Sequence, residues 1–284
     1  MIKHYPAEYY TAILNNQPMG FYPPYIICGE ARRRGISLLP PDVNASRSDF
    51  QAKNKSAIRV GLKQIRGMSS EALLLIAAER SRGVFNSPLE FMERSGVNRD
   101  IMENLIKCGA LDTLQENRRQ MLMEVPAWME YIKKKKSREQ ELFKSYKSGE
   151  VTDFDPREKE ALEREILGFD IRSHFMAELR GELSKRNIYS STEVKKLPGG
   201  KQVQAAGLLF RPHRPPTRSG KIVVFFSLTD EFGLIEVSVF EPVYMRYGDF
   251  IFGEQKAPLL VKGRISRRGN GVSIMAQEIS FLPM

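Results

Sequence analysis

Two short glycine turns carry the residues of this sequence that are best suited to chemistry, at positions 65–69 and 106–110. Each lies between stretches with the apolar spacing of helices. In a helix-hairpin-helix, the N–H groups of such a turn and the positive end of the next helix bind a DNA phosphate without reading bases. Glycine permits the close approach. The residues expected to contact duplex DNA are Lys63, Arg66, Gly67, Met68, Ser69, Lys107 and Gly109.

The first turn fits this role better than the second. A full Gly-hydrophobic-Gly turn would have glycine where Ser69 and Leu111 stand. In the alternative interpretation, the glycines only end the helices of a small helical domain. We expect Leu62 and Ile65 to end the helix before the first turn. After the second turn, we expect Asp112 to cap the following helix and the pair at 118–119 to add surface charge.

No motif in the sequence indicates catalysis. The Asp-Phe-Asp run at 153–155 could suggest a metal site, but Asp155, Pro156 and Glu158 have the spacing of a capping box with proline at the first helical position. His174 has no nearby partner suited to catalysis. We therefore predict no catalytic residue, no metal site and no cofactor in this chain.

The two cysteines, Cys28 and Cys108, are separated by 108 − 28 = 80 positions. Neither has a second cysteine or a histidine close by in the sequence. Zinc sites and disulfide frameworks require such neighbours. Both residues are therefore predicted to be buried thiols.

The composition indicates a polyanionic partner. The chain has 284 residues, with 44 Lys+Arg against 34 Asp+Glu, a formal net charge of +10 and a sequence pI of about 9.5. Nucleic acid fits this balance better than an anionic membrane does; the alternative is a basic protein without such a partner. The sequence has no apolar run of about 18 residues and no signal-peptide core, so we expect no membrane segment and a cytoplasmic location.

From about residue 201, the apolar spacing changes from a helical period to a period of two. Asn270 and Gly271 form a hairpin signal between the last two predicted strands, and a longer connection separates the third from the fourth. This pattern predicts a five-stranded Greek-key barrel of the OB type. The expected strands are 203–209, 222–228, 234–240, 259–265 and 272–279.

Basic and aromatic side chains gather at the turns of this predicted barrel. Charge that follows a backbone, together with rings that stack bases, is how OB barrels hold single strands. Because Phe225 and Phe226 are adjacent, they must point to opposite faces, so at most one stacks a base. The candidate residues for single-stranded DNA are Arg211, Arg214, Arg218, Lys221, Phe225, Arg264, Arg267 and Arg268.

The fold class follows as a multidomain α+β chain, in which a tandem helix-hairpin-helix domain precedes a C-terminal five-stranded OB-fold barrel. A length of 284 residues with 42% hydrophobic residues suits several small domains. The predicted parts are a helical region with an extended strap (1–55), the helix-hairpin-helix domain (56–118), a helical connector (119–195) and the barrel (196–284).

The connector contains two noteworthy runs. The four lysines at 133–136 are interpreted as a solvated face or a loose segment. Shortly after them, Gln140, Leu142 and Phe143 place two large apolar side chains in a very polar stretch. They could anchor in a hydrophobic groove of a partner protein; the alternative is a small satellite core contact.

Several runs of the sequence carry a family resemblance: YPAEYY at 5–10, LNNQPMGFY at 14–22, PDVNAS at 41–46, GLKQIRG at 61–67, LIKCGALD at 105–112 and EILGF at 165–169. With them, the chain resembles the bacterial DNA polymerase III alpha-subunit family over essentially its whole length. The run at 16–22, together with Arg214, Pro215 and Gly220, is most similar to the error-prone branch.

This resemblance implies the C-terminal part of such a polymerase: the end of the fingers, a tandem helix-hairpin-helix for duplex product and an OB domain for single-stranded template. The catalytic palm and its magnesium are expected upstream, so this chain alone should not polymerise and would need a separate catalytic chain. The resemblance also implies binding to the sliding clamp through Gln140, Leu142 and Phe143, although Glu139 stands where the motif has glutamine.

Two other functions are left open. An adaptor of the replication and repair machinery, with little affinity for DNA, would use the strap, the apolar pair at 142–143 and the barrel edges to bind proteins. A barrel that binds RNA is the other. Binding of a catalytic subunit without DNA would favour the first, and a comparison of DNA and RNA strands tests the second.

Overall fold

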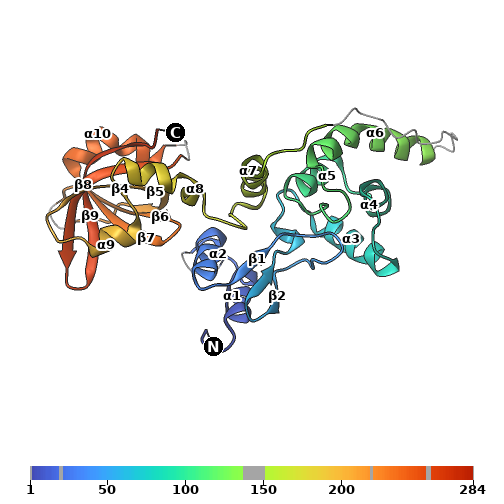
Figure 1. Ribbon diagram of the computed structural model, residues 1–284, viewed down its shortest axis with the longest axis horizontal. Helices are drawn as coiled ribbons and strands as arrows, with labels where there is room; N and C mark the ends of the chain where they lie inside the picture. The colour runs from blue at the N-terminus through green and yellow to red at the C-terminus, as the bar shows by residue number, and fades with distance from the viewer. Residues whose placement is uncertain (1, 19–21, 137–150, 218–219, 254–256, 284) are drawn as a thin grey trace. The chain divides into compact units, whose positions relative to one another are not determined.

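The computed structural model describes residues 2–18, 22–136, 151–217, 220–253 and 257–283. It consists of two compact units, Met1–Arg172 and Ser173–Met284, called here the helical unit and the barrel unit (Figure 1). Each has its own hydrophobic core. Among the helices described, none is long and apolar enough to cross a membrane.

The helical unit begins with two helices and a small sheet. Helices α1 (Pro6–Asn15) and α2 (Pro24–Arg33) each have proline in the first turn, where its missing N–H costs nothing. Strand β3 (Ala57–Arg59) lies between β1 (Ser37–Leu39), which is parallel to it, and β2 (Gln51–Asn54), which is antiparallel. The sequence predicts helices followed by an extended strap in this region, but not the small sheet.

The segment before the first glycine turn differs from its predicted α-helix. The structure has a three-residue 3₁₀ turn, η1 (Leu62–Gln64). The reason is that the preceding backbone N–H groups are used in other bonds: Val60 donates to Leu39 O at 3.0 Å and Leu62 donates to Arg47 O at 2.9 Å. The first bond continues the pairing of β3 with β1, and the second joins Leu62 to the segment before β2, so neither N–H is available for an α-helical bond.

The rest of the helical unit is a bundle of helices over one core. Buried side chains such as Phe85, Phe91, Met102, Leu105 and Trp128 fill it. Its helices are α3 (Ser70–Arg82), α4 (Pro88–Ser95), α5 (Arg99–Lys107), α6 (Arg118–Lys136) and α7 (Pro156–Leu167).

Two details of this unit confirm predictions. Helix α7 starts with the predicted capping box, in which the Asp155 carboxylate accepts the Glu158 N–H at 2.8 Å and the Glu158 carboxylate accepts the Asp155 N–H at 2.9 Å. Cys28 and Cys108 are buried free thiols. Burial raises the pKa of both thiols to about 12, so they are protonated at neutral pH.

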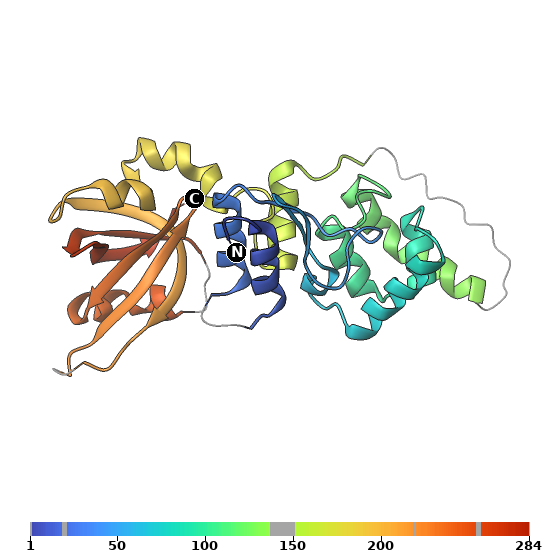
Figure 2. The same cartoon turned by 90° about the horizontal axis from the view of Figure 1, so that it is seen from below.

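The barrel unit contains the predicted five-stranded barrel (Figure 2). Its strands are hydrogen-bonded in the order β5-β6-β7-β9-β8, and pairing of β5 with β8 closes it. The long connection between the third and fourth strands is helix α10 (Glu241–Phe252). The strands are β5 (Gln202–His213), β6 (Val223–Asp230), β7 (Gly233–Phe240), β8 (Leu259–Arg268) and β9 (Gly271–Phe281).

Three short elements precede the barrel within this unit: α8 (Phe175–Lys185), β4 (Ile188–Tyr189) and α9 (Ser191–Lys196). Helix α8 packs outside the barrel wall, where Met176 and Leu183 share a cluster with Ala206 and Leu260. His174 caps α8, because its Nδ1 accepts the Met176 N–H at 3.1 Å. Its role is therefore structural, as predicted.

Candidate nucleic-acid interface

The first hairpin, residues 67–69, presents its backbone at the surface. Gly67 has a φ of +78°, which favours glycine, and the Met68 N–H donates to Ile65 O at 3.1 Å. Ser69 caps α3, because its Oγ accepts the Ala72 N–H at 3.1 Å. Gly67 and Ser69 are exposed. The start of α3 is thus open to a ligand.

A second hairpin with the same geometry lies at 96–98, which sequence reasoning missed. Gly96 has a φ of +63°, Val97 is buried, and the Asn98 side chain accepts the Ile101 N–H at 2.9 Å to cap α5. Gly96 and Asn98 are exposed, as in the first hairpin. The shared signal is glycine, an apolar residue and a capping residue directly before a helix.

The predicted second turn, at 106–110, has a different role. Gly109 has a φ of +77° but is buried, and a Cβ there would lie 2.2 Å from Arg118 Nη2. Glycine is needed because the Arg118 guanidinium passes over it. Gly109 therefore belongs to the interior, and Lys107 beside it is only half-exposed.

Arg118 is not the surface charge that the sequence suggested, because it is 1% exposed. It donates to the Asp112 carboxylate at 2.7 and 2.9 Å and to Glu163 Oε1 at 2.8 Å. Burial lowers the pKa of Arg118, but these bonds outweigh that effect and raise it. Asp112 is therefore not the predicted cap; Asn117 caps α6, accepting the Gln120 N–H at 2.9 Å.

The two basic side chains before the first hairpin are exposed but already engaged. Arg66 is 59% exposed and lies 3.2 Å from Glu165 at the end of α7. Lys63 is 62% exposed, with Nζ 3.9 Å from Asp49. The Asn104 amide of α5 also donates to Arg66 O at 2.8 Å, so the helix that starts at the second hairpin supports the first.

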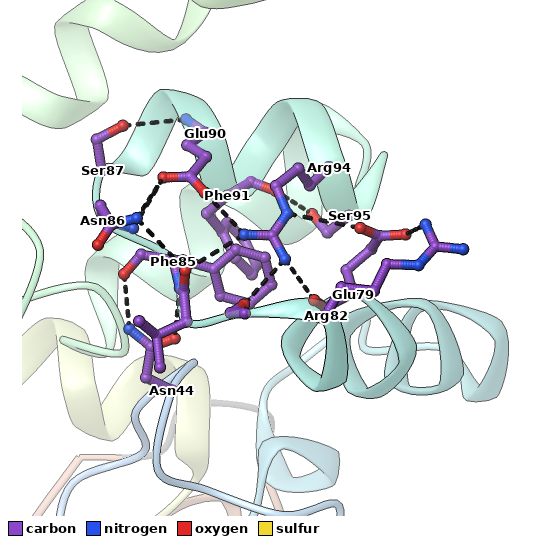
Figure 3. Close-up of polar contacts among 12 residues, drawn as sticks. Asn44, Glu79, Arg82, Phe85, Asn86, Ser87, Glu90, Phe91, Arg94 and Ser95 are labelled. Carbon is purple, nitrogen blue, oxygen red and sulfur yellow. Dashed lines mark hydrogen bonds and ion pairs between the residues drawn. The ribbon is translucent and has the colours of Figure 1, made fainter.

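Arg94, two residues before Gly96, fixes the end of α4 against α3 (Figure 3). Its guanidinium donates to the Glu90 carboxylate at 2.7 Å, to the Glu79 carboxylate at 3.5 Å and to three carbonyls where α3 ends. It also lies 4.6 Å from the centroid of the Phe85 ring. These contacts set the position from which the second hairpin starts.

On the barrel, cross-strand register places five residues in one row: His213, Phe225, Ser238, Met275 and Arg264. Phe225 and Met275 are both 36% exposed. The His213 and Phe225 rings stack, with centroids 5.7 Å apart. These five residues, called here the barrel face, form a row that follows the curved outer wall of the barrel and includes predicted residues of β6 and β8.

The remaining predicted basic residues of the barrel divide into two groups. Arg267 folds back and donates to Leu197 O at 3.1 Å and to Lys195 O at 2.7 Å, so it closes the end of α9. Other predicted basic residues are exposed at the ends of the strands: Arg211, Arg214, Lys221 and Arg268.

Comparisons with known proteins bear on both units. A family model described as a helix-hairpin-helix motif matches residues 35–121, which include both hairpins. A model described as an OB-fold nucleic acid binding domain matches residues 203–282. The error-prone DNA polymerase of Symbiobacterium thermophilum is 36% identical over 99% of this chain. Over nearly its whole length, the chain is therefore similar to the C-terminal region of error-prone DNA polymerases.

The chain spans about 30% of that relative's length, in its C-terminal region. The error-prone DNA polymerase of Pseudomonas fluorescens is 33% identical over 98% of this chain and 27% of that protein. A crystal structure of asparaginyl-tRNA synthetase from Pyrococcus horikoshii matches 34% of this chain and 23% of the synthetase chain, at 19% sequence identity and a TM-score of 0.28.

Four predicted site residues lie outside the described residues: Arg218 and the clamp-binding candidates Gln140, Leu142 and Phe143. In the parts of the chain that are described, no group of three or more His, Cys, Asp or Glu residues could hold a metal ion. Phe226 is 1% exposed and points into the barrel, whereas its neighbour Phe225 is 36% exposed, so the two point to opposite faces as predicted.

Proposed function

We propose that this region of an error-prone polymerase holds primer-template DNA, the duplex through the two hairpins and the single strand across the barrel face. The observation that carries the proposal is the repeated hairpin geometry. Gly67 and Gly96 each have positive φ, and each leads within three residues to an exposed, side-chain-capped helix start. Such starts hold phosphates through N–H groups that have no partner within the helix.

The hairpins would set the register on the duplex, and most of the affinity would come from overall charge. Each of the two helices has a carboxylate in its first turn, Glu71 in α3 and Asp100 in α5. These carboxylates oppose a phosphate there. The net charge of +10 acts over a longer range, so binding should weaken steeply with salt.

The barrel face would hold the single strand by stacking and charge. Phe225, already stacked on His213, offers a ring to a base, and Arg264 lies three strands away in the same row. With ~4.8 Å between neighbouring strands, the path from Phe225 to Arg264 along the barrel wall is about 14 Å. Base stacking on one such ring contributes ~1–3 kcal/mol, which does not depend strongly on sequence.

We further propose that these residues perform no nucleotidyl transfer and that the polymerisation chemistry belongs to other parts of the enzyme. Purified chain should therefore incorporate no labelled nucleotide into a primer-template. Clamp binding through residues 139–143 stays a prediction. Clamp affinity that is unchanged by Leu142→Ala with Phe143→Ala would contradict it.

The direct test is fluorescence anisotropy against a single strand, a duplex and a primer-template junction at two salt concentrations. We expect the junction to bind most tightly and binding to weaken as salt rises. Weak binding to all three would contradict the proposal and favour the adaptor alternative. A specific observation supports that alternative: Leu74 is 72% and Leu75 43% exposed on α3.

A further inference from the structure

A groove rich in amide side chains lies on the outer wall of the barrel, next to the barrel face. It has a volume of about 360 Å³ and runs across β4, β5, β8 and β9. Small-molecule sites typically measure ~300–1,000 Å³, so the groove can take one group of that size. Its amide-bearing lining residues are Asn187, Gln202, Gln204 and Gln277.

The groove offers hydrogen bonds without net charge. Among the described residues that line it, the charged ones are Lys262 and Glu278, which pair with one another at 2.9 Å and are about half exposed. An amide supplies both donors and an acceptor, whereas a phosphate only accepts and is bound by donors, from cationic side chains or backbone N–H groups. The lining therefore matches a neutral ligand whose edge carries donors and acceptors side by side.

An aromatic ring also borders the groove. Tyr189 of β4 is half-buried, and Lys201 Nζ lies 5.6 Å from its ring centroid. Rings that border amide groups are typical of sites where a protein holds an unpaired nucleobase, since the base stacks while its edge is hydrogen-bonded. Among the bases, adenine pairs best with a Gln amide, which contacts N6 and N7 together.

The groove is connected to the barrel face through Arg264. Gln202 lies opposite Arg264 in the register of β5 and β8. In the amide orientation that satisfies both ends of Gln202, its nitrogen donates to Gln277 Oε1 at 3.0 Å and its oxygen accepts from Arg264 Nε at 3.0 Å. A strand that leaves the barrel face past Arg264 would therefore meet the amides next.

We propose that this groove is a nucleobase subsite, which binds one base of the single strand, preferably adenine, while Arg264 contacts an adjacent phosphate. The inference rests on the proposed binding of single-stranded DNA by the barrel face. It adds a base preference to a surface that otherwise binds by stacking and charge.

The test uses the full chain and two strands of about 20 nucleotides, longer than the ~4–16 nucleotides of one OB-fold site. One strand is all thymidine, and the other has adenine at regular intervals. We expect the adenine-containing strand to bind about fivefold to tenfold more tightly, as one bidentate amide contact allows. Gln204→Ala with Gln277→Ala should abolish that preference and change binding of the thymidine strand by about twofold or less.

The matched control is Gln51→Ala on β2 of the helical unit, which should keep the preference. Melting curves of each variant confirm folding. Equal binding of both strands by the unaltered chain, or a preference that survives the double substitution, would overturn the subsite alone. If the unaltered chain binds neither strand, the proposed single-strand function fails and the subsite fails with it.

Discussion

The helical unit and the barrel unit use their basic side chains in different ways. In the helical unit, Arg118 is buried in an ion-pair network, and Arg94 of α4 donates hydrogen bonds to carbonyls at the end of α3. On the barrel, Arg264 lies on the outer surface in one row with Phe225. The comparison teaches that formal charge does not locate an interface. In the helical unit the candidate contacts are backbone groups, and on the barrel they are side chains.

This difference can be tested experimentally, because each substitution should affect stability, duplex binding or single-strand binding, and not all three. Trp128 is the only tryptophan and is buried in the core of the helical unit. Its fluorescence therefore follows unfolding of that unit alone, which separates loss of folding from loss of binding.

The largest effect is expected for Arg118→Met. The substitution leaves Glu163, which is 2% exposed, as a buried carboxylate without its partner. Breaking a buried pair in this way typically costs ~3–5 kcal/mol, so the free energy of unfolding should fall by about that amount. Urea unfolding followed by Trp128 fluorescence measures it.

The matched control for that experiment is Arg34→Met, which removes an exposed i,i+4 pair with Glu30. Such a pair contributes only ~0.3–0.5 kcal/mol. If Arg118→Met left stability nearly unchanged and instead weakened DNA binding, Arg118 would be a DNA contact and the comparison between the units would be wrong.

The next effect is expected on the barrel face. Phe225→Ala removes the phenyl ring of the row, and the loss of one stacked base should weaken single-strand binding by ~1–3 kcal/mol. Duplex affinity should be unchanged. Anisotropy titrations with both DNAs measure this, with Met245→Ala as the control because Met245 is 72% exposed on α10 of the same unit. Equal losses of affinity for both DNAs would mean that the barrel face does not bind the single strand selectively.

The hairpins can be tested with a matched pair of glycines. Gly96 and Gly35 both have positive φ, +63° and +78°, and neither has an atom within 4 Å of an added Cβ. Alanine at either should therefore cost a similar ~1–2 kcal/mol of backbone strain. Only Gly96→Ala puts a methyl group where a phosphate must approach, so only it should weaken duplex binding, by severalfold. Identical duplex affinities for the two variants would argue against the second hairpin.

The features that sequence predicted are local ones. Alternating residues such as Val203 and Ala205 specify the barrel strands, because the period of two is visible within one strand. The capping box at Asp155 needs only four consecutive residues, and the opposite directions of Phe225 and Phe226 follow from their adjacency alone.

The features that sequence missed depend on distant residues or on elements too short to show a pattern. Whether Arg118 is on the surface is decided by Glu163, 45 positions later. Strand β3 has three residues, too few to show a period. The second hairpin was placed at Gly109 and not at Gly96, because the burial of Gly109 depends on Arg118, nine positions later.

The smallest expected effect concerns Arg66, the predicted contact that is shared with α7. Glu165→Gln removes the carboxylate 3.2 Å from its guanidinium, and both side chains are more than half exposed. A surface pair of this kind contributes ~0.2–1 kcal/mol. Arg66 keeps its bond to the Glu165 carbonyl, so the loosened guanidinium should raise duplex affinity by about twofold at most and leave single-strand affinity unchanged.

The control for Glu165→Gln must carry the same change in net charge. Glu8→Gln on the exposed side of α1 does so at a distance from the hairpin in sequence and on another element. The gain from Glu165→Gln should also shrink as salt rises, since exposed charges are screened within about 10 Å at 0.1 M. Equal gains from both variants would assign the effect to overall charge, and Arg66 would then remain a bridge to α7 whose role is structural.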